Sequence, residues 1–192
     1  MHDDLLERDF TASRPDTKWL TDITEHPTGE GKLYLCAIKD CASNRIVGYS
    51  LGERMTSDLA VAALRNAIAL RSPTGTIMHS DRGSQFRARK YVLTLSSAGL
   101  RGSMGRVGAA GDNAAMESFF ALLQKNVLNR RTWATREQRV LAPVTLPPRS
   151  PRDRDLDRTD LPPTRRQERL GRLTPIEFET IYTTTPQTAT AA

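Results

Sequence analysis

Three acidic residues stand at positions where a carboxylate could do chemistry. Asp22 falls in an alternating stretch typical of a strand, Asp81 follows a short apolar run typical of a strand end, and Glu117 lies in the first turns of a helical pattern. Each also has an ordinary explanation, because an acid at a strand end often begins a turn and an acid near a helix N-terminus complements the macrodipole. If the three converged, their oxygens would suit Mg²⁺, a hard cation that prefers carboxylate and water ligands.

The elements that must position these carboxylates alternate in the manner of an α/β domain. Apolar and polar residues alternate over 19–24, which places Asp22 on the opposite face of a strand from Trp19. The turn-like stretch 40–44 predicts that the strands on either side of it form an antiparallel hairpin. The other predicted elements are strands 32–38, 45–51, 76–79 and 101–104, and helices 58–71 (capped by Ser57), 84–98 and 112–128. The last helix carries an apolar stripe made by Met116, Phe120, Leu123 and Val127.

Length and composition exclude several classes of protein. The chain has 192 residues, of which 38% are hydrophobic and 26% charged, and this is typical of one ordinary globular domain with a tail. No run approaches the roughly 18 apolar residues that a membrane span needs, and the acidic start lacks the pattern of a secretion signal. Two cysteines, Cys36 and Cys41, and three scattered histidines exclude a disulfide framework and argue against a zinc site.

Positive charge is concentrated toward the C-terminus. Residues 125–172 hold 13 Lys or Arg against six Asp or Glu, whereas the whole chain carries +6 from 28 basic and 22 acidic residues. A basic tail on a nearly neutral body indicates a polyanionic partner, most simply nucleic acid. A solvated, disordered tail accounts for the charge equally well.

The spacing of the three acids and the words around them resemble those of a known family. Thirty-five residues separate Asp81 from Glu117, as in the D,D(35)E signature of retroviral-type integrases and related transposases. From about residue 18 to 132 the chain resembles the catalytic domain of bacterial insertion-sequence transposases, the second-reading-frame type with an integrase-like core. The matching words are Trp19-Leu-Thr-Asp22-Ile-Thr24, Tyr34-Leu35, Arg45-Ile-Val-Gly48, His79-Ser-Asp81-Arg-Gly-Ser-Gln85, Asp112-Asn113 and Glu117-Ser-Phe-Phe120.

This resemblance implies a fold, a site and a reaction. The fold is ribonuclease-H-like, an α/β domain with a five-stranded mixed sheet flanked by helices, followed here by an irregular basic Pro/Arg-rich tail. Asp22, Asp81 and Glu117 would be the catalytic residues and the ligands of two Mg²⁺ ions, for which Mn²⁺ could substitute. The implied reaction is metal-dependent phosphodiester cleavage and DNA strand transfer, in which water and then a DNA 3′-hydroxyl attack phosphorus.

Further positions match the family near the site and are candidates for contacts with DNA. His79 precedes Asp81, although a satisfied histidine at a sheet end is an equal alternative. The glycine-rich stretch 105–111 stands where integrases have a mobile loop before the catalytic helix. Many relatives have a lysine seven residues beyond the catalytic glutamate; here that residue is Gln124, and the lysine follows it, about 80° around the helix from Glu117. The candidates are His79, Gln85, Arg106, Asn113, Gln124 and Lys125.

The resemblance also implies partners and an organisation. The substrate would be DNA, both the element ends and the target duplex. A homo-oligomer would act on this DNA at the nucleoid, in the bacterial cytoplasm, with no membrane involved. Only 21 residues precede Asp22, so recognition of the ends would come from elsewhere, such as a separate DNA-recognition protein from the first reading frame. The expected organisation is a lead-in 1–16, an integrase-type core 17–134, an irregular segment 135–173, and a short helix with a frayed end 174–192.

The tail departs from the family pattern. Six of the 11 prolines fall within 143–163, where relatives have an amphipathic helix, and the family word Arg-Leu-Gly-Arg-Leu-Thr-Pro resumes only at 169–175. We hypothesise that compensating frameshifts altered about 139–164; codons that cannot encode such a helix in another frame would remove this idea. Two alternatives stay open: a catalytically inactive transposase remnant that retains nonspecific DNA binding, and a ribonuclease-H-like nuclease acting on RNA hybrids.

Overall fold

The computed structural model describes residues 3–105, 114–126, 129, 133–135 and 178–179. Its elements are β1 (Lys18–Thr28), β2 (Gly31–Asp40), β3 (Ile46–Gly52), α1 (Ser57–Arg71), β4 (Ile77–Ser80), α2 (Ser84–Arg87), α3 (Arg89–Ser97), β5 (Arg101–Met104) and α4 (Ala114–Asn126). The predictions for 106–113 and 136–177, including the glycine-rich loop and the Pro/Arg-rich segment, lie outside the described residues.

The strands form one mixed sheet in the order β3-β2-β1-β4-β5. β1 pairs antiparallel with β2, and β2 with β3, so the predicted hairpin is confirmed. β1 pairs parallel with β4, and β4 with β5. The five-stranded mixed sheet expected from the sequence is therefore confirmed, and the parallel pair brings together two strands that are distant in the chain.

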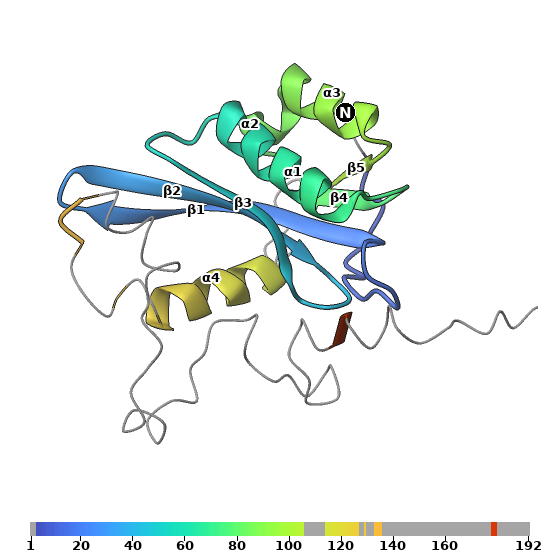
Figure 1. The fold of residues 1–192 in the computed structure, drawn as a ribbon, viewed down its shortest axis with the longest axis horizontal. Coiled ribbons are helices and arrows are strands. Elements are labelled where there is room, and N and C mark those ends of the chain that lie inside the picture. The colour runs from blue at the N-terminus through green and yellow to red at the C-terminus, as the bar shows by residue number, and fades with distance from the viewer. Residues whose placement is uncertain (1–2, 106–113, 127–128, 130–132, 136–177, 180–192) are drawn as a thin grey trace, which may run out of the picture.

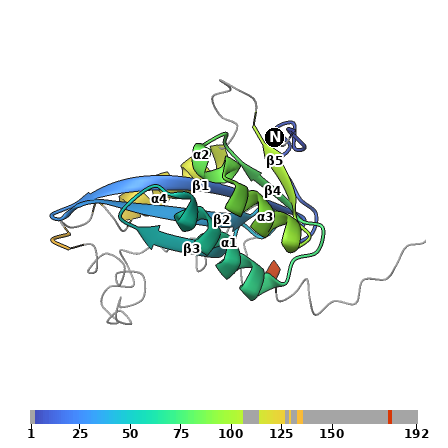
Figure 2. The same cartoon turned by 90° about the horizontal axis from the view of Figure 1, so that it is seen from above.

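Helices cover both faces of this sheet (Figure 1). On one face α1, α2 and α3 pack over a core cluster that includes Trp19, Ile38, Leu64 and Tyr91. Figure 2 shows the same helices lying over the strands in the view from above. On the other face α4 packs over a second cluster, which also takes in the N-terminal segment. That cluster consists of Leu6, Leu20, Ala37, Cys41, Met116, Phe119, Phe120 and Leu123.

The alternation of side chains along β1 determines which residues pack against α1 and α3 and which pack against α4. Trp19 is fully buried under α1 and α3, whereas Leu20 contributes to the α4 cluster. Successive side chains of a strand point to opposite faces, so Asp22 shares the α4 face with Leu20. The predicted stripe on the last helix is confirmed for Met116, Phe120 and Leu123, which are all buried. Its fourth member, Val127, lies outside the described residues.

A glycine lets α1 lie close to β3. A Cβ at Gly48 would stand 2.5 Å from the carbonyl oxygen of Ala63 and 2.7 Å from the Cβ of Ala67. Side chains with a Cβ essentially never approach backbone that closely, so only glycine fits at this contact. The small residues along this face of α1 therefore set how closely the helix packs on the sheet.

Three predicted boundaries were wrong. The side chain of Thr56, not Ser57, caps α1 by accepting a hydrogen bond from the amide of Leu59. The helix predicted over 84–98 is two helices, because Ala88 has extended backbone angles (φ −61°, ψ 137°). β1 runs to Thr28, beyond the predicted end at 24, because it pairs with β2 along its length as far as Gly31.

Of the predicted C-terminal helix, only Phe178 and Glu179 lie in the described part of the chain, and both are helical there. In the same described residues, no helix combines the length and apolar character that crossing a membrane requires.

Candidate active site

Asp22 and Asp81 occupy matching positions on neighbouring parallel strands. The last registered pair of β1 and β4 is Leu20 with His79, and each aspartate comes two residues further along its own chain. Neighbouring parallel strands have the same rise of about 3.3 Å per residue, so the two aspartates lie side by side just beyond the last hydrogen-bonded pair. The structure thus brings together two acids that are 59 residues apart in the sequence.

Helix α4 runs alongside β1 and places Glu117 opposite Asp22. Met116 near the start of the helix packs in the same cluster as Leu20, and further along the Nδ1 of His26 lies 3.0 Å from the Oε1 of Gln124. From Asp22 to His26 the strand advances about 13 Å, and from Glu117 to Gln124 the helix advances about 10 Å. Because the two advances nearly match, the contact at one end fixes the helix so that its glutamate faces the aspartate at the other.

The three carboxylates interact electrostatically. Burial raises the pKa of Asp22 to about 6; a hydrogen bond from the Ile23 amide opposes the rise, and the charges of Asp81 and Glu117 add to it. Like charges raise a carboxyl pKa appreciably only at short range, so this site concentrates negative charge. Titratable groups with such perturbed pKa values occur preferentially at functional sites.

Local hydrogen bonds hold the two aspartates. The Oδ1 of Asp22 accepts a hydrogen bond of 2.7 Å from the amide of Ile23, and the Oδ1 of Asp81 accepts one of 2.9 Å from the amide of Gly83. Within the residues that the structure describes, no three His, Cys, Asp or Glu side chains are gathered tightly enough to hold a metal ion.

The site nevertheless fits a divalent cation in its chemistry. Its donors are all carboxylate oxygens, which hard cations prefer, and a positive charge would remove the repulsion that raises the pKa of Asp22. Binding would require the side chains of Asp22, Asp81 and Glu117 to turn toward a common point. Asp81 and Glu117 are exposed, so solvent-facing rotamers are open to both.

His79 is buried beneath this site. Its side chain is 2% exposed, its Nδ1 lies 2.9 Å from the Oγ of Ser103 on β5, and the ring of Phe10 meets it edge-on with centroids 5.7 Å apart. The Oγ of Ser103 also accepts a hydrogen bond from the amide of Leu5. This placement favours the structural alternative for His79, which is to hold the end of β4 that leads to Asp81.

The other DNA-contact candidates have different surroundings. Gln85 folds back over Gly83, where its amide occupies the space that a Cβ would need, so it lies beside the turn that holds Asp81. Gln124 is partly buried against His26, whereas Lys125 is exposed on α4. Arg106 and Asn113 lie outside the described residues.

Sequence reasoning missed His26 and Ser103 as parts of this region. His26 lies four residues after Asp22, which puts both on one face of a strand, so the period of two was a usable signal. Ser103 gave no local signal, because its role depends on the parallel pairing of β4 with β5.

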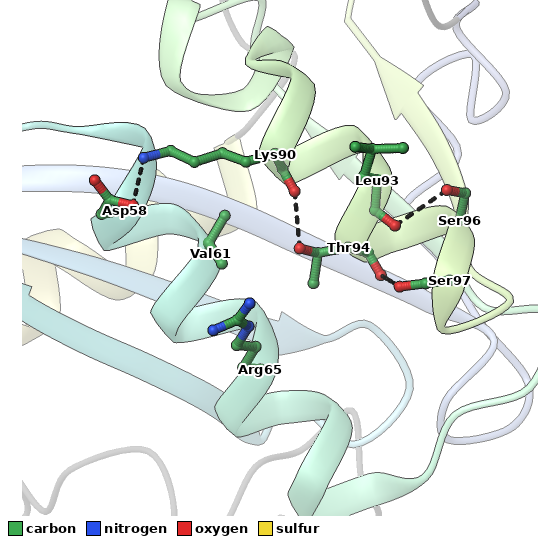
Figure 3. A pocket seen from close by; sticks show the side chains of 8 residues that line it. All are labelled: Asp58, Val61, Arg65, Lys90, Leu93, Thr94, Ser96 and Ser97. Atoms are coloured by element: carbon green, nitrogen blue, oxygen red, sulfur yellow. Dashed lines mark hydrogen bonds and ion pairs between the residues drawn. The ribbon is translucent and has the colours of Figure 1, made fainter.

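A groove elsewhere on the molecule is not part of this site. It has a volume of about 570 Å³ and lies between α1 and α3, on the sheet face opposite α4. Figure 3 shows Asp58, Val61 and Arg65 of α1 facing residues of α3, with an ion pair between Asp58 and Lys90. The carboxylates of the candidate site therefore lie apart from this groove.

Comparison with known proteins agrees with this arrangement. The model of a family described as "Integrase core domain" matches residues 12–110, just over half of the chain. The chain belongs to the integrase core domain family. The matched stretch contains Asp22 and Asp81, and in the structure α4 with Glu117 follows it.

Curated relatives of this integrase core chain are insertion-element proteins. It is 37% identical over 179 residues to an uncharacterised 31 kDa protein of insertion element IS600 from Shigella sonnei, covering 93% of this chain and 62% of the relative. It is 42% identical over 136 residues to the transposase InsF of IS3A from Escherichia coli, covering 70% and 47%. A transposase of IS629 from Shigella sonnei is 36% identical over 180 residues, covering 93% and 57%. The chain thus spans about half to three fifths of these relatives.

Solved structures share the fold. The HTLV-2 integrase catalytic core in complex with magnesium, in its trimeric form, matches with a TM-score of 0.60 and 19% identity over 88% of this chain and 99% of that one. Its dimeric form matches with a TM-score of 0.51 and 21% identity over 70% and 79%. The integrase core chain therefore has the ribonuclease-H-like fold of retroviral integrase catalytic cores, as its sequence predicts.

Proposed function

We propose that this chain is the catalytic core of a DNA transposase, which cuts and joins phosphodiester bonds with divalent metal held by Asp22, Asp81 and Glu117. The observation that carries this proposal is that Asp22 and Asp81 each follow the last registered pair of β1 and β4 by two residues, and that the charges of Asp81 and Glu117 both act on Asp22. Membership of the integrase core family and likeness to insertion-sequence transposases support it. The magnesium in the HTLV-2 integrase core supports the choice of metal.

Each acid has a distinct share in the proposed chemistry. Asp22 interacts electrostatically with both other acids and is the least exposed of the three, so it would contact both of the two Mg²⁺ ions, while Asp81 and Glu117 would each complete one site. When bound, such ions stabilise the charge on the attacking and leaving oxygens of an in-line displacement, and Mn²⁺ would serve in place of Mg²⁺. Burial is the main cause of the elevated pKa of Asp22, and the negative charges of Asp81 and Glu117, which this pair would neutralise, add to it.

The reaction would proceed in two displacements at phosphorus. Water would attack first, forming a new P–O bond while the bond to a DNA 3′-oxygen breaks, and the departing oxygen would leave as a 3′-hydroxyl. That hydroxyl would then attack a phosphate of the target strand and release a second hydroxyl. Neither step needs a nucleophile from the protein, which fits a site whose reactive groups are all carboxylates.

DNA would be held by groups around the site. Lys125 is exposed on α4, and Gln85 lies over the turn of Asp81, which supports a contact between each of them and a bound strand. Arg106 and Asn113 are proposed from the sequence alone.

We extend the proposal to the organisation and partners of the protein. The catalytic core would span 17–134, and homo-oligomers would join two DNA ends. A separate protein from the first reading frame would recognise those ends, and the reaction would take place at the bacterial nucleoid.

The proposal is tested by incubating the purified chain with end-labelled duplex DNA, with Mg²⁺, with Mn²⁺ and with chelator. Metal-dependent nicks or joined products are expected from the parent. Asp22→Asn, Asp81→Asn and Glu117→Gln should each reduce the rate by at least about 10³-fold while the circular dichroism spectrum is unchanged, because each removes one charged ligand.

Asp58→Asn is the matched control, since it removes a carboxylate from the opposite face of the sheet. It should cleave like the parent. Full activity in any of the three site variants would refute the assignment of that residue. Salt-sensitive DNA binding with no cleavage in either metal would instead support an inactive remnant.

A further inference from the structure

Glu179, near the C-terminus, is buried against the core between two arginines. The Oε2 atom of Glu179 accepts hydrogen bonds of 2.7 Å from the Nη1 of Arg45 and 2.7 Å from the Nη1 of Arg71. The Glu179 side chain is 8% exposed, against 30% for Arg45 and 12% for Arg71. A carboxylate so far from water is stable only when its charge is paired and hydrogen-bonded, which both guanidinium groups provide.

Arg45, Arg71, Asp16 and Glu179 form one ion-pair cluster. The Nε of Arg71 donates to Asp16 at 2.9 Å, so Asp16 pairs with Arg71 beside Glu179. Asp40 lies next to Asp16, but its oxygens already accept from backbone amides of residues 16, 42 and 43, from the hydroxyl of Ser43 and from the indole of Trp19. Among the described residues, Glu179 is the carboxylate that pairs with both Arg45 and Arg71, so these two arginines form its receiving site.

This site lies at the far end of the sheet from the catalytic carboxylates. Asp16 precedes β1, and the amide of Ile77 at the start of β4 bonds to the carbonyl of Thr17, so the arginines gather where these parallel strands begin. Asp81 follows the other end of β4, about 13 Å away along four residues of strand. A group docked between the arginines leaves the carboxylate site open.

We propose that the Arg45–Arg71 site is an intramolecular docking site that fastens the C-terminal segment of this chain to its own core through Glu179. Residues 136–177 then connect two anchored points. At the near end, Trp133 is buried and its carbonyl accepts a 2.9 Å hydrogen bond from the amide of Gly29; at the far end stands Glu179.

The test compares the full chain with Glu179→Gln by thermal unfolding and by hydrogen exchange read by mass spectrometry. Glu179→Gln removes the charge but keeps the size of the side chain, and it leaves the partly buried Arg45 and Arg71 without the carboxylate that joins them. We expect the melting temperature to fall by at least about 5 °C, as loss of one partner of a buried ion pair implies for a chain of this size. Amides around 178–179 and 43–45 should exchange at least tenfold faster.

Glu25→Gln is the matched control, because it removes a carboxylate from an exposed ion pair with Lys32, and it should leave both measurements unchanged. Should Glu179→Gln fail to fold, Arg45→Gln provides the second test, since Arg71 still holds the carboxylate, and a smaller shift in the same amides is expected. Unchanged melting and exchange in both variants would overturn the docking site.

The measurements are repeated after dilution, with light scattering to report the molecular mass. Protection around 178–179 that persists in a monomer supports docking within one chain. Protection that disappears as the protein dissociates would overturn the proposal, because Glu179 would then be received by a second copy. DNA cleavage per folded molecule should be the same in Glu179→Gln as in the parent, which separates this proposal from that of the catalytic site.

Discussion

Asp22 and Asp81 each stand two residues beyond the last registered pair of the β1–β4 ladder, Leu20 with His79. This shared position at the edge of a parallel pair makes them neighbours although 58 residues lie between them. The charge of Glu117 acts on Asp22 from α4, and this helix is held along β1 by its apolar stripe and by the contact between His26 and Gln124. The proposed function depends on the proximity of Asp22, Asp81 and Glu117.

Asp22→Asn should stabilise the metal-free protein at neutral pH. The pKa of Asp22 is raised to about 6 in the folded state from 3.8, so the folded state binds the proton more tightly than the unfolded state. Ionisation of Asp22 therefore lowers the free energy of unfolding of the parent. The loss begins as pH rises above about 4, is complete above about 6, and amounts to at most about 3 kcal/mol. Denaturant unfolding in the presence of chelator, from pH 4 to 8, should show that the free energy of unfolding of the variant rises relative to that of the parent over this pH range.

Asp58→Asn controls for the simple loss of a negative charge, since Asp58 lies on the other face of the sheet. An Asp22→Asn variant less stable than the parent at pH 8 would mean that the site does not concentrate negative charge as described.

Gln124→Ala and His26→Ala should impair catalysis more than DNA binding. The 3.0 Å contact between these side chains fixes the position of α4 along β1. A displacement of about 1 Å at a reacting group can lower the rate 10²-fold. Each variant should lower kcat by at least about tenfold, and the double variant should be little worse than either alone.

Lys125→Ala serves as the comparison for Gln124, because Lys125 is the exposed neighbour on the same helix. It should weaken DNA binding and reduce its salt dependence. A Gln124→Ala variant that behaves like Lys125→Ala would show that Gln124 meets DNA instead of positioning the helix.

Gly48→Ala should destabilise the fold by about 2 kcal/mol, because the added methyl would overlap the α1 backbone at Ala63. Gly52→Ala is the milder counterpart, since its Cβ would meet the flexible end of Leu59 at 3.2 Å. Urea unfolding of the two variants would measure the difference. Equal stability of Gly48→Ala and the parent would show that α1 is free to lift from the sheet.

Tyr91→Phe should be neutral or stabilising by about 1 kcal/mol. The hydroxyl of Tyr91 is buried and has no hydrogen-bond partner among the residues that the structure describes, and burying an unsatisfied hydroxyl is unfavourable. Phe at this position would keep the edge-on contact with Phe86, whose ring centroid is 5.4 Å away. Thermal unfolding measures the effect, and a loss above about 1 kcal/mol would reveal a partner for the hydroxyl.

The strands and helices could be predicted from local patterns in the sequence, whereas the choice of Asp22, Asp81 and Glu117 as site residues rests on the resemblance to a family. Alternation put Asp22 on the face opposite Trp19, and helical spacing identified the stripe on α4. The break at Ala88 could not be predicted, since apolar residues continue through it at helical spacing. The pairing of Gln124 with His26 and the burial of Glu179 join residues about 100 or more apart, so no local pattern could indicate them.

Anomalous X-ray diffraction from crystals soaked in Mn²⁺ would test the central claim most directly. We expect manganese peaks within about 2.5 Å of carboxylate oxygens of Asp22, Asp81 and Glu117, with the side chains turned together, and no such peaks in Asp22→Asn. A saturated crystal with no manganese between these three side chains, from protein that cleaves DNA under the same conditions, would contradict the account.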